Sequence, residues 1–271
     1  MKKIINYVAL FVLTISLVLI GADLLKQNQS DGVTKLDLVK TNRERETIIV
    51  ADDINYPPYS YLDKSGNPQG FSLELVQEAA NAMGYNVEFR LGEWNSVRQA
   101  LENDEVDIIA GMFYSETRSK TYDFTNRHSI TSGDIFTRNT SEKIEGIFDL
   151  RGKTIVVQDS DIVYEYLKEQ NIDIKFIRVP TVSEALHLVE DGSYDYAALL
   201  SIPANYILKN EKIKNVSSKG LFIAPKDYSM VVNKGNDELL LKLNSGLYLL
   251  KTSGRYQEIY EKWLGVYEEK T

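Results

Sequence analysis

Residues 106–118 read Val-Asp-Ile-Ile-Ala-Gly-Met-Phe-Tyr-Ser-Glu-Thr-Arg, and Tyr122-Asp-Phe-Thr125 follows closely. The first five residues predict a buried strand, after which the chain turns polar and delivers Arg118 just beyond the strand end. Ligand clefts in α/β domains form outside the carboxyl ends of strands. Arginine is the side chain best shaped to hold a carboxylate with two parallel bonds. Taken alone, Arg118 fits an ordinary surface loop equally well, because most arginines lie at the surface.

Hydrophobic periodicity around this segment predicts two blocks with the same order of elements. The expected strands are 47–51, 87–91, 106–110, 154–158, 172–179 and 196–200, and the expected helices lie around Val76–Met83, 96–103, 161–170, Val182–Val189, 239–250 and 255–263. Strand-helix alternation is typical of parallel sheets covered by helices. We therefore expect two α/β lobes with a cleft between them, and one continuous doubly wound sheet is the alternative.

The bulk composition excludes several classes of function. The chain has 271 residues, is 43% hydrophobic and 26% charged, and carries a net charge of −8 without any basic stripe, so nucleic acid is not an expected partner. It contains no cysteine and only two histidines, His128 and His187, which argues against thiol chemistry, disulfides and a metal centre. We expect no cofactor and no metal.

The N-terminus predicts export. Lys2 and Lys3 precede the uncharged apolar run Ile4–Ala22, which is typical of a signal peptide and is also close to the ~20 residues that span a bilayer. Residues 1–22 are therefore a signal peptide or a membrane anchor, and the polar residues 23–46 are a tether. A lipid-modified N-terminus is excluded because no cysteine follows the run. We expect the rest of the chain to be extracytoplasmic, in the periplasm or at the outer face of the cell membrane.

Several motifs occur in an order that resembles a known family. They are Asp53–Tyr59, Gly70-Phe71 with Glu74-Leu75, Val106–Gly111, Ser115–Arg118, Asp123–Thr125, Leu150–Lys153, Gly192–Asp195 and Tyr256–Leu264. Together they resemble the bacterial extracellular solute-binding proteins of family 3, the polar amino-acid receptors of ABC importers, over about Thr47–Val266. The sequence variants Gly-Met-Phe-Tyr-Ser at 111–115 and Val-Gln-Asp-Ser-Asp at 157–161 also look like those of the extracytoplasmic sensor domains fused to kinases or cyclic-dinucleotide enzymes.

The resemblance implies a periplasmic-binding-protein-like clamshell of two α/β lobes joined by two hinge strands. Lobe 1 would comprise residues 47–136 and 228–271, and lobe 2 residues 139–226. The hinge strands would lie near Asp134–Thr137 and Ser229–Val232. A ligand between the lobes would favour the closed state.

The resemblance also implies ligand contacts in the first lobe. Tyr56 matches the aromatic side chain over the ligand, Trp94 a side-chain contact, and Arg118 the arginine that binds the ligand carboxylate. Tyr56 is alternatively a turn residue pinned by two prolines, and Trp94 a core residue. Gly111, which follows Ala110 in the binding segment, would let a backbone N–H approach the ligand closely.

In the second lobe, Gln158-Asp-Ser-Asp161 matches the strand-to-helix turn of the family, with Ser160 and Asp161 as the expected ligand contacts. Backbone N–H groups at the helix N-terminus would attract an anionic ligand group there, although both residues are equally compatible with simple helix caps. Two positions depart from the family pattern. Phe113 stands where a Ser or Thr is frequent, and Leu200 stands where a carboxylate commonly binds the α-ammonium group of the ligand. Either Asp161 or Asp53 replaces that carboxylate, or the ligand lacks an amine, because a buried unpaired ammonium is costly.

Three functions follow from these residues. The leading one is a binding protein that presents a small carboxylate, with an amino acid as the favoured class, to an ABC permease. The second is a ligand sensor of a membrane signalling system, acting through a partner kinase or cyclase or as part of a longer chain. The third is a dehydratase-like enzyme, for which Asp53, Asp161 and Glu165 are the nearest acids. No paired catalytic constellation accompanies these acids, and we expect the protein not to be an enzyme.

Overall fold

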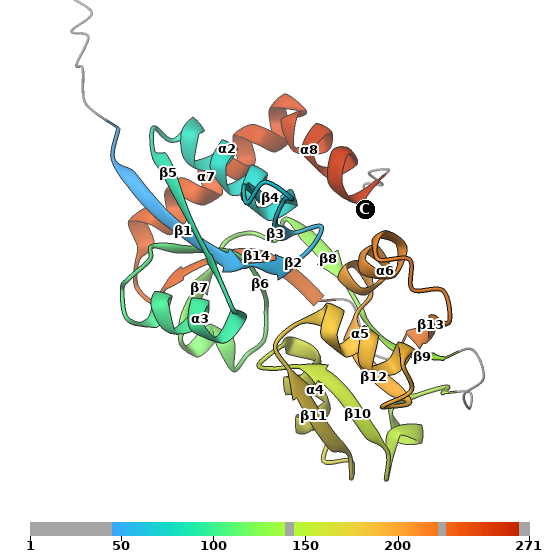
Figure 1. Ribbon diagram of the computed structural model, residues 1–271. Coiled ribbons are helices and arrows are strands. Elements are labelled where there is room, and N and C mark those ends of the chain that lie inside the picture. Colours follow the sequence, from blue (N-terminus) through green and yellow to red (C-terminus); the bar gives the residue numbers. More distant parts are fainter. Residues whose placement is uncertain (1–44, 139–143, 222–225, 266–271) are drawn as a thin grey trace, which may run out of the picture. The chain divides into compact units, whose positions relative to one another are not determined.

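Two separate β-sheets organise the part of the chain that the computed structural model describes, which comprises residues 45–138, 144–221 and 226–265 (Figure 1). The expected signal peptide or anchor at 1–22 lies outside the described residues, as does nearly all of the tether at 23–46. Within the described ranges, the helices are too short or too polar to cross a membrane. Among the described residues the strands form separate sheets and not one continuous sheet, which favours the two-lobed arrangement over the alternative.

The first sheet has six strands in the order β5-β1-β6-β14-β7, with β8 paired to β14. Its strands are β1 (Thr47–Asp53), β5 (Asn86–Gly92), β6 (Ile108–Phe113), β7 (Tyr122–Phe124), β8 (Ser129–Thr131) and β14 (Lys226–Asn233). β1 is parallel to both β5 and β6, whereas β14 returns from late in the chain and runs antiparallel to β6. The chain runs from β1 to β5 on one side and then returns past β1 to β6 on the other. The strand order therefore reverses between β1 and β6, the kind of position where ligands bind in α/β sheets.

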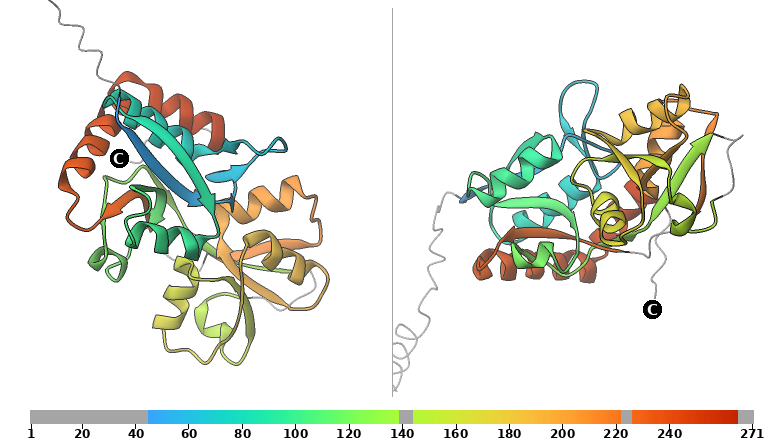
Figure 2. Two further views of the ribbon diagram at one scale, coloured as in Figure 1. Left: turned by 60° about the vertical axis from the view of Figure 1, so that its left-hand side comes forward. Right: turned by 90° about the horizontal axis from the view of Figure 1, so that it is seen from below.

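Helices cover both faces of the first sheet (Figures 1 and 2). They are α2 (Phe71–Ala82), α3 (Trp94–Glu102), α7 (Asp237–Ser253) and α8 (Arg255–Leu264). Val50 of β1 belongs to the core that contains the buried side of α2, and its neighbour Ala51 belongs to the core that contains Leu101 of α3. Successive strand residues point to opposite faces, so α2 and α3 lie on opposite sides of the sheet.

The contact between α2 and α7 depends on a small residue. A Cβ atom on Gly246 would lie 2.4 Å from the carbonyl oxygen of Ala79. The two helices therefore pack closely because α7 has no side chain at that point. α8 is tied to the same helix through Glu74, whose carboxylate accepts hydrogen bonds from Arg255 and Trp263. These contacts anchor the C-terminal helices to the first lobe.

The second sheet has five strands in the order β11-β10-β12-β9-β13. Its strands are β9 (Gly133–Arg138), β10 (Thr154–Gln158), β11 (Lys175–Val179), β12 (Tyr196–Leu200) and β13 (Val216–Leu221), and its helical elements are η2 (Ile147–Leu150), α4 (Ile162–Glu169), α5 (Val182–Glu190) and α6 (Ser201–Asn210). β10 is parallel to β11 and β12, and β9 is antiparallel to β12. The arrangement around β10 therefore repeats the arrangement around β1. We call each sheet with its helices a lobe.

The chain crosses between the sheets twice. The first crossing lies between β8 and β9, at Ser132, and the second lies between the end of β13 and the start of β14. Residues 133–136, which the sequence analysis assigned to lobe 1, pair with β12 and β13 of the second sheet instead. An extended segment next to a crossing can pair with either sheet, and its hydrophobic pattern would be the same in both cases. The sequence pattern therefore could not assign residues 133–136 to one sheet.

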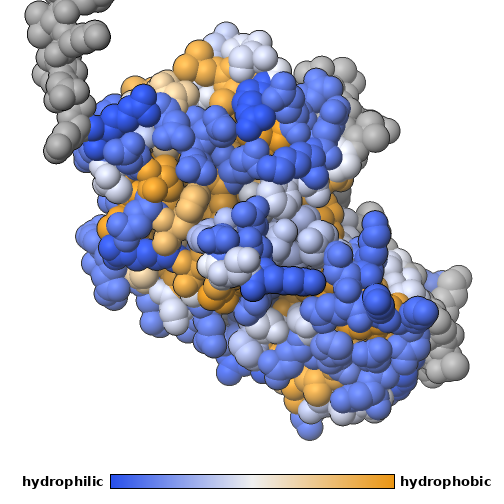
Figure 3. Space-filling model, turned by 45° about the horizontal axis from the view of Figure 1, so that its top comes forward, coloured by the Kyte–Doolittle hydropathy of each residue, from blue (hydrophilic) through white to orange (hydrophobic). Residues whose placement is uncertain are grey.

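Some elements were not predicted from the sequence. A small sheet is formed by β2 (Asn55–Tyr56), β3 (Ser60–Leu62) and β4 (Pro68–Gln69), whose short strands give too little alternation to recognise. Helix α6 contains Pro203, which sits in its first turn, where proline is tolerated. Figure 3 shows one face of the molecule, on which hydrophilic residues predominate and apolar residues form scattered patches.

Candidate functional site

The candidate site lies where the carboxyl ends of β1, β6 and β10 meet. Asp52 and Asp53 end β1, Phe113 ends β6, and Gln158 ends β10. The short helix η1 (Arg118–Lys120) follows β6, and α4 follows β10 after one tight turn. The fold therefore brings polar residues from both lobes to one place, as expected for the carboxyl edges of two α/β sheets.

A small cavity occupies this place. It has a volume of about 20 Å³ and is lined by Asp52, Asp53, Tyr56, Trp94, Gly111, Met112, Phe113, Arg118, Gln158, Asp161 and Tyr228. That volume accommodates roughly one water molecule and not an amino acid. A larger cleft of about 210 Å³ adjoins it, since Trp94 lines both spaces.

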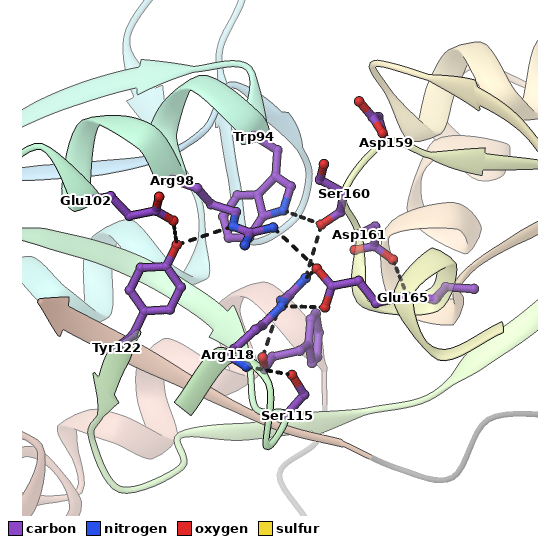
Figure 4. Close-up of polar contacts among 12 residues, drawn as sticks. Trp94, Arg98, Glu102, Ser115, Arg118, Tyr122, Asp159, Ser160, Asp161 and Glu165 are labelled. Carbon is purple, nitrogen blue, oxygen red and sulfur yellow. Dashed lines mark hydrogen bonds and ion pairs between the residues drawn. The ribbon is translucent and has the colours of Figure 1, made fainter. Parts of the chain in front are cut away.

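Arg118 is almost entirely buried and is held by contacts from both lobes (Figure 4). Its Nε and Nη2 atoms donate to the two carboxylate oxygens of Glu165, at 2.9 and 3.0 Å. Nη2 also donates to the carbonyl oxygen of Ser160 at 3.1 Å, and Nη1 to that of Phe113 at 3.3 Å. The two parallel bonds to Glu165 have the geometry in which arginine binds carboxylates most strongly. Glu165 was considered in the sequence only as a candidate acid, and its position on Arg118 is a new finding.

A second arginine accompanies this pair. Arg98 on α3 donates from Nη1 to the Glu165 carboxylate at 3.3 Å and from Nε to the Tyr122 hydroxyl at 3.4 Å. Tyr122 in turn donates to the carboxylate of Glu102. Arg98 and Glu165 are each about one quarter exposed, at 22% and 24% of their side-chain surface, whereas Arg118 is 2% exposed. Glu165 therefore lies between a buried and a partly solvated cation.

Backbone and side-chain bonds across the cleft add to these ion pairs. Trp94 donates from Nε1 to the carbonyl oxygen of Ser160 at 3.0 Å, and Gln158 donates from Nε2 to Asp53 at 2.7 Å. Ser160 has a positive φ of 56°, a conformation uncommon for residues with a side chain. The carbonyl oxygen of this residue accepts hydrogen bonds from both Trp94 and Arg118 of the opposite lobe.

Acidic side chains form the other end of the cavity. Burial raises the pKa of Asp53 to about 6, and the negative charge of Asp161 raises it further. The hydrogen bonds that Asp53 accepts from Asn55 and Gln158 act in the opposite direction and lower its pKa. Asp161 is partly exposed, yet removal of its carboxyl group from water raises its pKa to about 6 as well. The backbone hydrogen bond from Val163 acts in the opposite direction and lowers the pKa. Burial likewise raises the pKa of Asp52. Three carboxyl groups with weakened acidity therefore face one small space, an arrangement that favours a positively charged group.

Aromatic rings form the floor and one wall of the cavity. Tyr228 packs against Phe113, with ring centroids 4.3 Å apart, and Tyr56 stacks near Tyr59 at 5.9 Å. A Cβ atom on Gly111 would lie 2.2 Å from the Tyr228 hydroxyl oxygen. The glycine is therefore required by the packing of Tyr228. Whether its N–H contacts a ligand, as the sequence suggested, stays a prediction.

The structure brings most of the predicted site residues together. Those that line the cavity are Asp53, Tyr56, Trp94, Gly111, Phe113, Arg118 and Asp161. Ser160 contributes its backbone carbonyl, while Ala110 and Leu200 are buried in strands and do not line the cavity. Asp161 caps α4, because its side chain accepts a hydrogen bond from Val163 N, whereas Ser160 makes no such cap.

Sequence reasoning missed four residues of the cavity wall, namely Asp52, Met112, Gln158 and Tyr228. Asp52 and Gln158 are polar residues at the ends of predicted strands, so their positions were an available signal. Tyr228 comes from a distant strand, and nothing local announces its contact with Phe113. No group of three metal-ligating side chains occurs among the residues that the structure describes.

Residues 48–266 match the family described as bacterial extracellular solute-binding proteins, family 3. An L-cystine-binding protein of Bacillus subtilis is 25% identical over 242 residues, covering 89% of this chain and 88% of the relative. Among solved structures, a histidine kinase sensor domain with similarity to periplasmic binding proteins is 38% identical, with a TM-score of 0.79 over 83% of this chain and 100% of that one. An ancestral arginine-binding protein bound to arginine is 28% identical, with a TM-score of 0.77 over 82% of this chain and 99% of that one.

Proposed function

The chain belongs to the bacterial extracellular solute-binding proteins of family 3, and from this premise we propose that it captures a small carboxylate ligand, an amino acid in the simplest case, between its two lobes. The predicted clamshell fold is confirmed by the two-sheet structure and its solved neighbours. The relatives include proteins that bind cystine and arginine.

One observation carries the proposal: Arg118 already holds a carboxylate with two parallel bonds beside a cavity lined by acids. A ligand carboxylate in place of the Glu165 carboxylate would retain the bidentate geometry. Its ammonium group would then lie toward Asp53 and Asp161, which would take the role of the carboxylate that Leu200 does not supply. Trp94 and Tyr56 would enclose the aliphatic part, as aromatic walls commonly do in small-molecule sites.

The proposed role places the protein outside the cytoplasm, with residues 1–22 as signal peptide or anchor and an ABC permease as partner. A sensory role is the second candidate, and it is favoured by the 38% identity to a histidine kinase sensor domain. The genes that neighbour this one separate the two, because permease and ATPase genes accompany importers and a kinase or cyclase gene accompanies a sensor. The matched family is described as solute-binding proteins, and we propose no catalytic activity.

A thermal-shift screen tests the ligand class. Each α-amino acid is compared with its amide, which lacks the carboxylate, and with its deaminated acid, which lacks the amine. At a ligand concentration 100 times Kd, binding adds about 2.7 kcal/mol to the free energy of unfolding, which raises the Tm by roughly 5–10 °C for a domain of this size. We expect an α-amino acid to stabilise the protein more than either analogue. Equal stabilisation by the amide would rule out Arg118 as the carboxylate anchor.

A further inference from the structure

Helix α7 carries apolar side chains on two opposite sides. Its buried residues include Leu239, Leu243, Leu247 and Leu250, which pack into the core of the first lobe. Leu241, Tyr248 and Leu249 lie on the other side and are 67%, 67% and 46% exposed. A helix that is hydrophobic all round is normally covered on every side. The exposed side of α7 is therefore a candidate contact surface.

The outward residues of α7 form one stripe, which we call the α7 stripe: Leu241, Ser245, Tyr248, Leu249 and Thr252. A period of 3.6 residues per turn places these positions on one side of the helix. Three of the seven large apolar side chains that are exposed in the described part of the chain belong to it. Residues 243–250 contain no charge, whereas the exposed positions 257, 258, 261 and 262 of α8 are Gln, Glu, Glu and Lys. The stripe thus differs from an ordinary solvated helix face.

The α7 stripe faces away from the ligand cavity. The opposite side of α7 packs on α2, where Gly246 lies against Ala79. None of the residues of α7, all of which the structure describes, lines the cavity or the cleft beside it. A ligand between the lobes therefore does not cover the stripe, and a contact made through it is independent of the proposed ligand-binding function.

The α7 stripe is complementary to a second copy of itself in the antiparallel orientation. Ser245 lies at its centre, four residues from Leu241 on one side and four from Leu249 on the other. A two-fold axis beside Ser245 therefore places Leu241 of each copy against Leu249 of the other, so the same apolar contact is made twice. Tyr248 borders the axis and adds an aromatic ring, a type of side chain that is enriched at interfaces.

Charges at the two ends of α7 favour the same orientation. The first turn contains Asp237 and Glu238, and the last turn contains Lys251. Lys251 donates from Nζ to the carbonyl oxygen of Arg127 at 3.2 Å, which places a second basic residue, itself more than half exposed, at that end. Glu238 is also bonded to Lys242 of its own helix, yet 80% of its side-chain surface remains exposed. Antiparallel pairing brings the acidic end of each copy to the basic end of the other, whereas parallel pairing would bring like charges together.

The size of the surface sets the strength of such a contact. α7 has 17 residues and is about 26 Å long at ~1.5 Å per residue, and a helix with its side chains is about 10 Å wide. Pairing through α7 therefore covers less than the roughly 800 Å² per partner of a standard interface. We expect association in the micromolar range and not a permanent dimer.

We propose that two copies of this chain form a homodimer through an antiparallel, two-fold contact between their α7 stripes, centred on Ser245. Each copy covers the outward Leu241, Tyr248 and Leu249 of the other, and both ligand cavities stay outside the interface. The contact accounts for an apolar side of α7 that its own lobe leaves exposed.

Disulfide cross-linking of the full chain tests this geometry. The chain has no cysteine, so each introduced cysteine is unique. We expect Ser245→Cys to form a disulfide-linked dimer on mild oxidation, because the two copies of residue 245 meet at the axis. Leu241→Cys alone should not, since its two copies lie about 12 Å apart along the helices, beyond the reach of a disulfide. A mixture of Leu241→Cys and Leu249→Cys chains should cross-link.

Gln257→Cys, at an exposed position of α8, is the control for random collisions. Absence of the Ser245→Cys dimer, or an equal yield from Gln257→Cys, overturns the proposal. Cross-linking of Leu241→Cys to itself also overturns it, because that product requires parallel pairing.

Sedimentation velocity of the full chain tests the affinity. We expect a concentration-dependent equilibrium between monomer and dimer. Leu241→Asp places two unpaired charges in the contact and should weaken dimerisation at least about 30-fold, as loss of an interface hot spot does. Leu62→Asp makes the same substitution at an exposed leucine of β3 and should leave the equilibrium unchanged.

A parent chain that remains monomeric at high micromolar concentrations overturns the proposal and leaves the α7 stripe as a docking face for a different protein. An equal effect of Leu241→Asp and Leu62→Asp overturns it as well. Circular dichroism establishes that Leu241→Asp is folded. If that variant does not fold, the cross-linking of Ser245→Cys still decides, because it leaves the apolar residues of the stripe in place.

Discussion

The arginine end and the acid end of the cavity carry opposite charges and differ in how far the protein itself satisfies them. At the arginine end, Glu165 neutralises Arg118 with two short bonds. At the acid end, Asp53 receives one bond from Gln158 and one from a backbone N–H, and the Oδ2 atom of Asp52 has no hydrogen-bond partner among the described residues. The arginine end is thus neutralised by a side chain of the protein, whereas the acid end has no such opposite charge among the described residues and would be stabilised by a cation.

This difference indicates two kinds of selection in one site. At the arginine end, Arg118 is already paired with Glu165. A ligand carboxylate that replaces Glu165 there would therefore add only the difference between its own interaction free energy with Arg118 and that of Glu165. Burial raises the pKa values of the carboxyl groups at the acid end, and a ligand ammonium group there would add an opposite charge that the protein itself does not supply. We therefore expect the amine to contribute strongly to affinity, although the expected carboxylate at position 200 is a leucine.

The largest expected effect is that of Arg118→Ala. Loss of one partner of a buried charge pair costs about 2–5 kcal/mol, which corresponds to a loss in affinity of at least roughly 30-fold. We expect binding to be abolished in a calorimetric titration while circular dichroism shows an intact fold. Arg118→Lys keeps the charge without the planar fork and should recover only part of the affinity. Unchanged affinity in Arg118→Ala would mean that the ligand is held elsewhere.

Asp53→Asn and Asp161→Asn test the acid end. Each removes a negative charge without a change in size, and asparagine still caps helices well, so the start of α4 should persist. We expect roughly 10-fold weaker binding of an amino acid and no loss for the deaminated acid. Asp159→Asn is the matched control, because Asp159 pairs with Arg178 and does not line the cavity. Equal losses for both ligands would assign these acids a structural role.

The pH dependence of affinity tests the same end without mutation. Burial raises the pKa values of Asp53 and Asp161 to about 6, and an adjacent ammonium group would lower them in a complex. Affinity for an amino acid should therefore be full above about pH 6 and fall below it, by up to about ten-fold per pH unit for each proton taken up. A deaminated acid should show the opposite trend. Affinities measured by titration between pH 5 and 8 that do not vary would contradict this expectation.

The smallest expected effect is that of Arg98→Ala. Its ion pair with Glu165 is longer, at 3.3 Å, and both side chains are partly solvated, so the pair contributes less than about 1 kcal/mol. We expect ligand affinity to change by about five-fold or less and the change to shrink in high salt. A loss as large as that of Arg118→Ala would place Arg98 in direct contact with the ligand.

Local sequence predicted the fold well where hydrophobic periodicity was regular. The predicted strands 154–158 and 196–200 coincide with β10 and β12. The strand predicted at 106–110 is β6, which runs from Ile108 to Phe113. The chain was expected to turn polar after Ala110, whereas the apolar residues Met112 and Phe113 continue the strand. The side chains that could bind a ligand were predicted from motif order, and the partners they meet were not. Glu165 is one acid among several on a polar helix face, and only the approach of the second lobe brings it to Arg118.

Trp94 gives the two-lobed arrangement an optical consequence. It is one of two tryptophans in the chain, and its indole N–H is bonded to Ser160 of the opposite lobe. The other, Trp263 on α8, is bonded to Glu74 within the first lobe. Parting of the lobes would expose the Trp94 indole to water and shift its emission to the red, while the surroundings of Trp263 would stay the same. With Trp263→Phe as background, the intrinsic fluorescence of this protein would follow the opening of its cleft in real time and without any label.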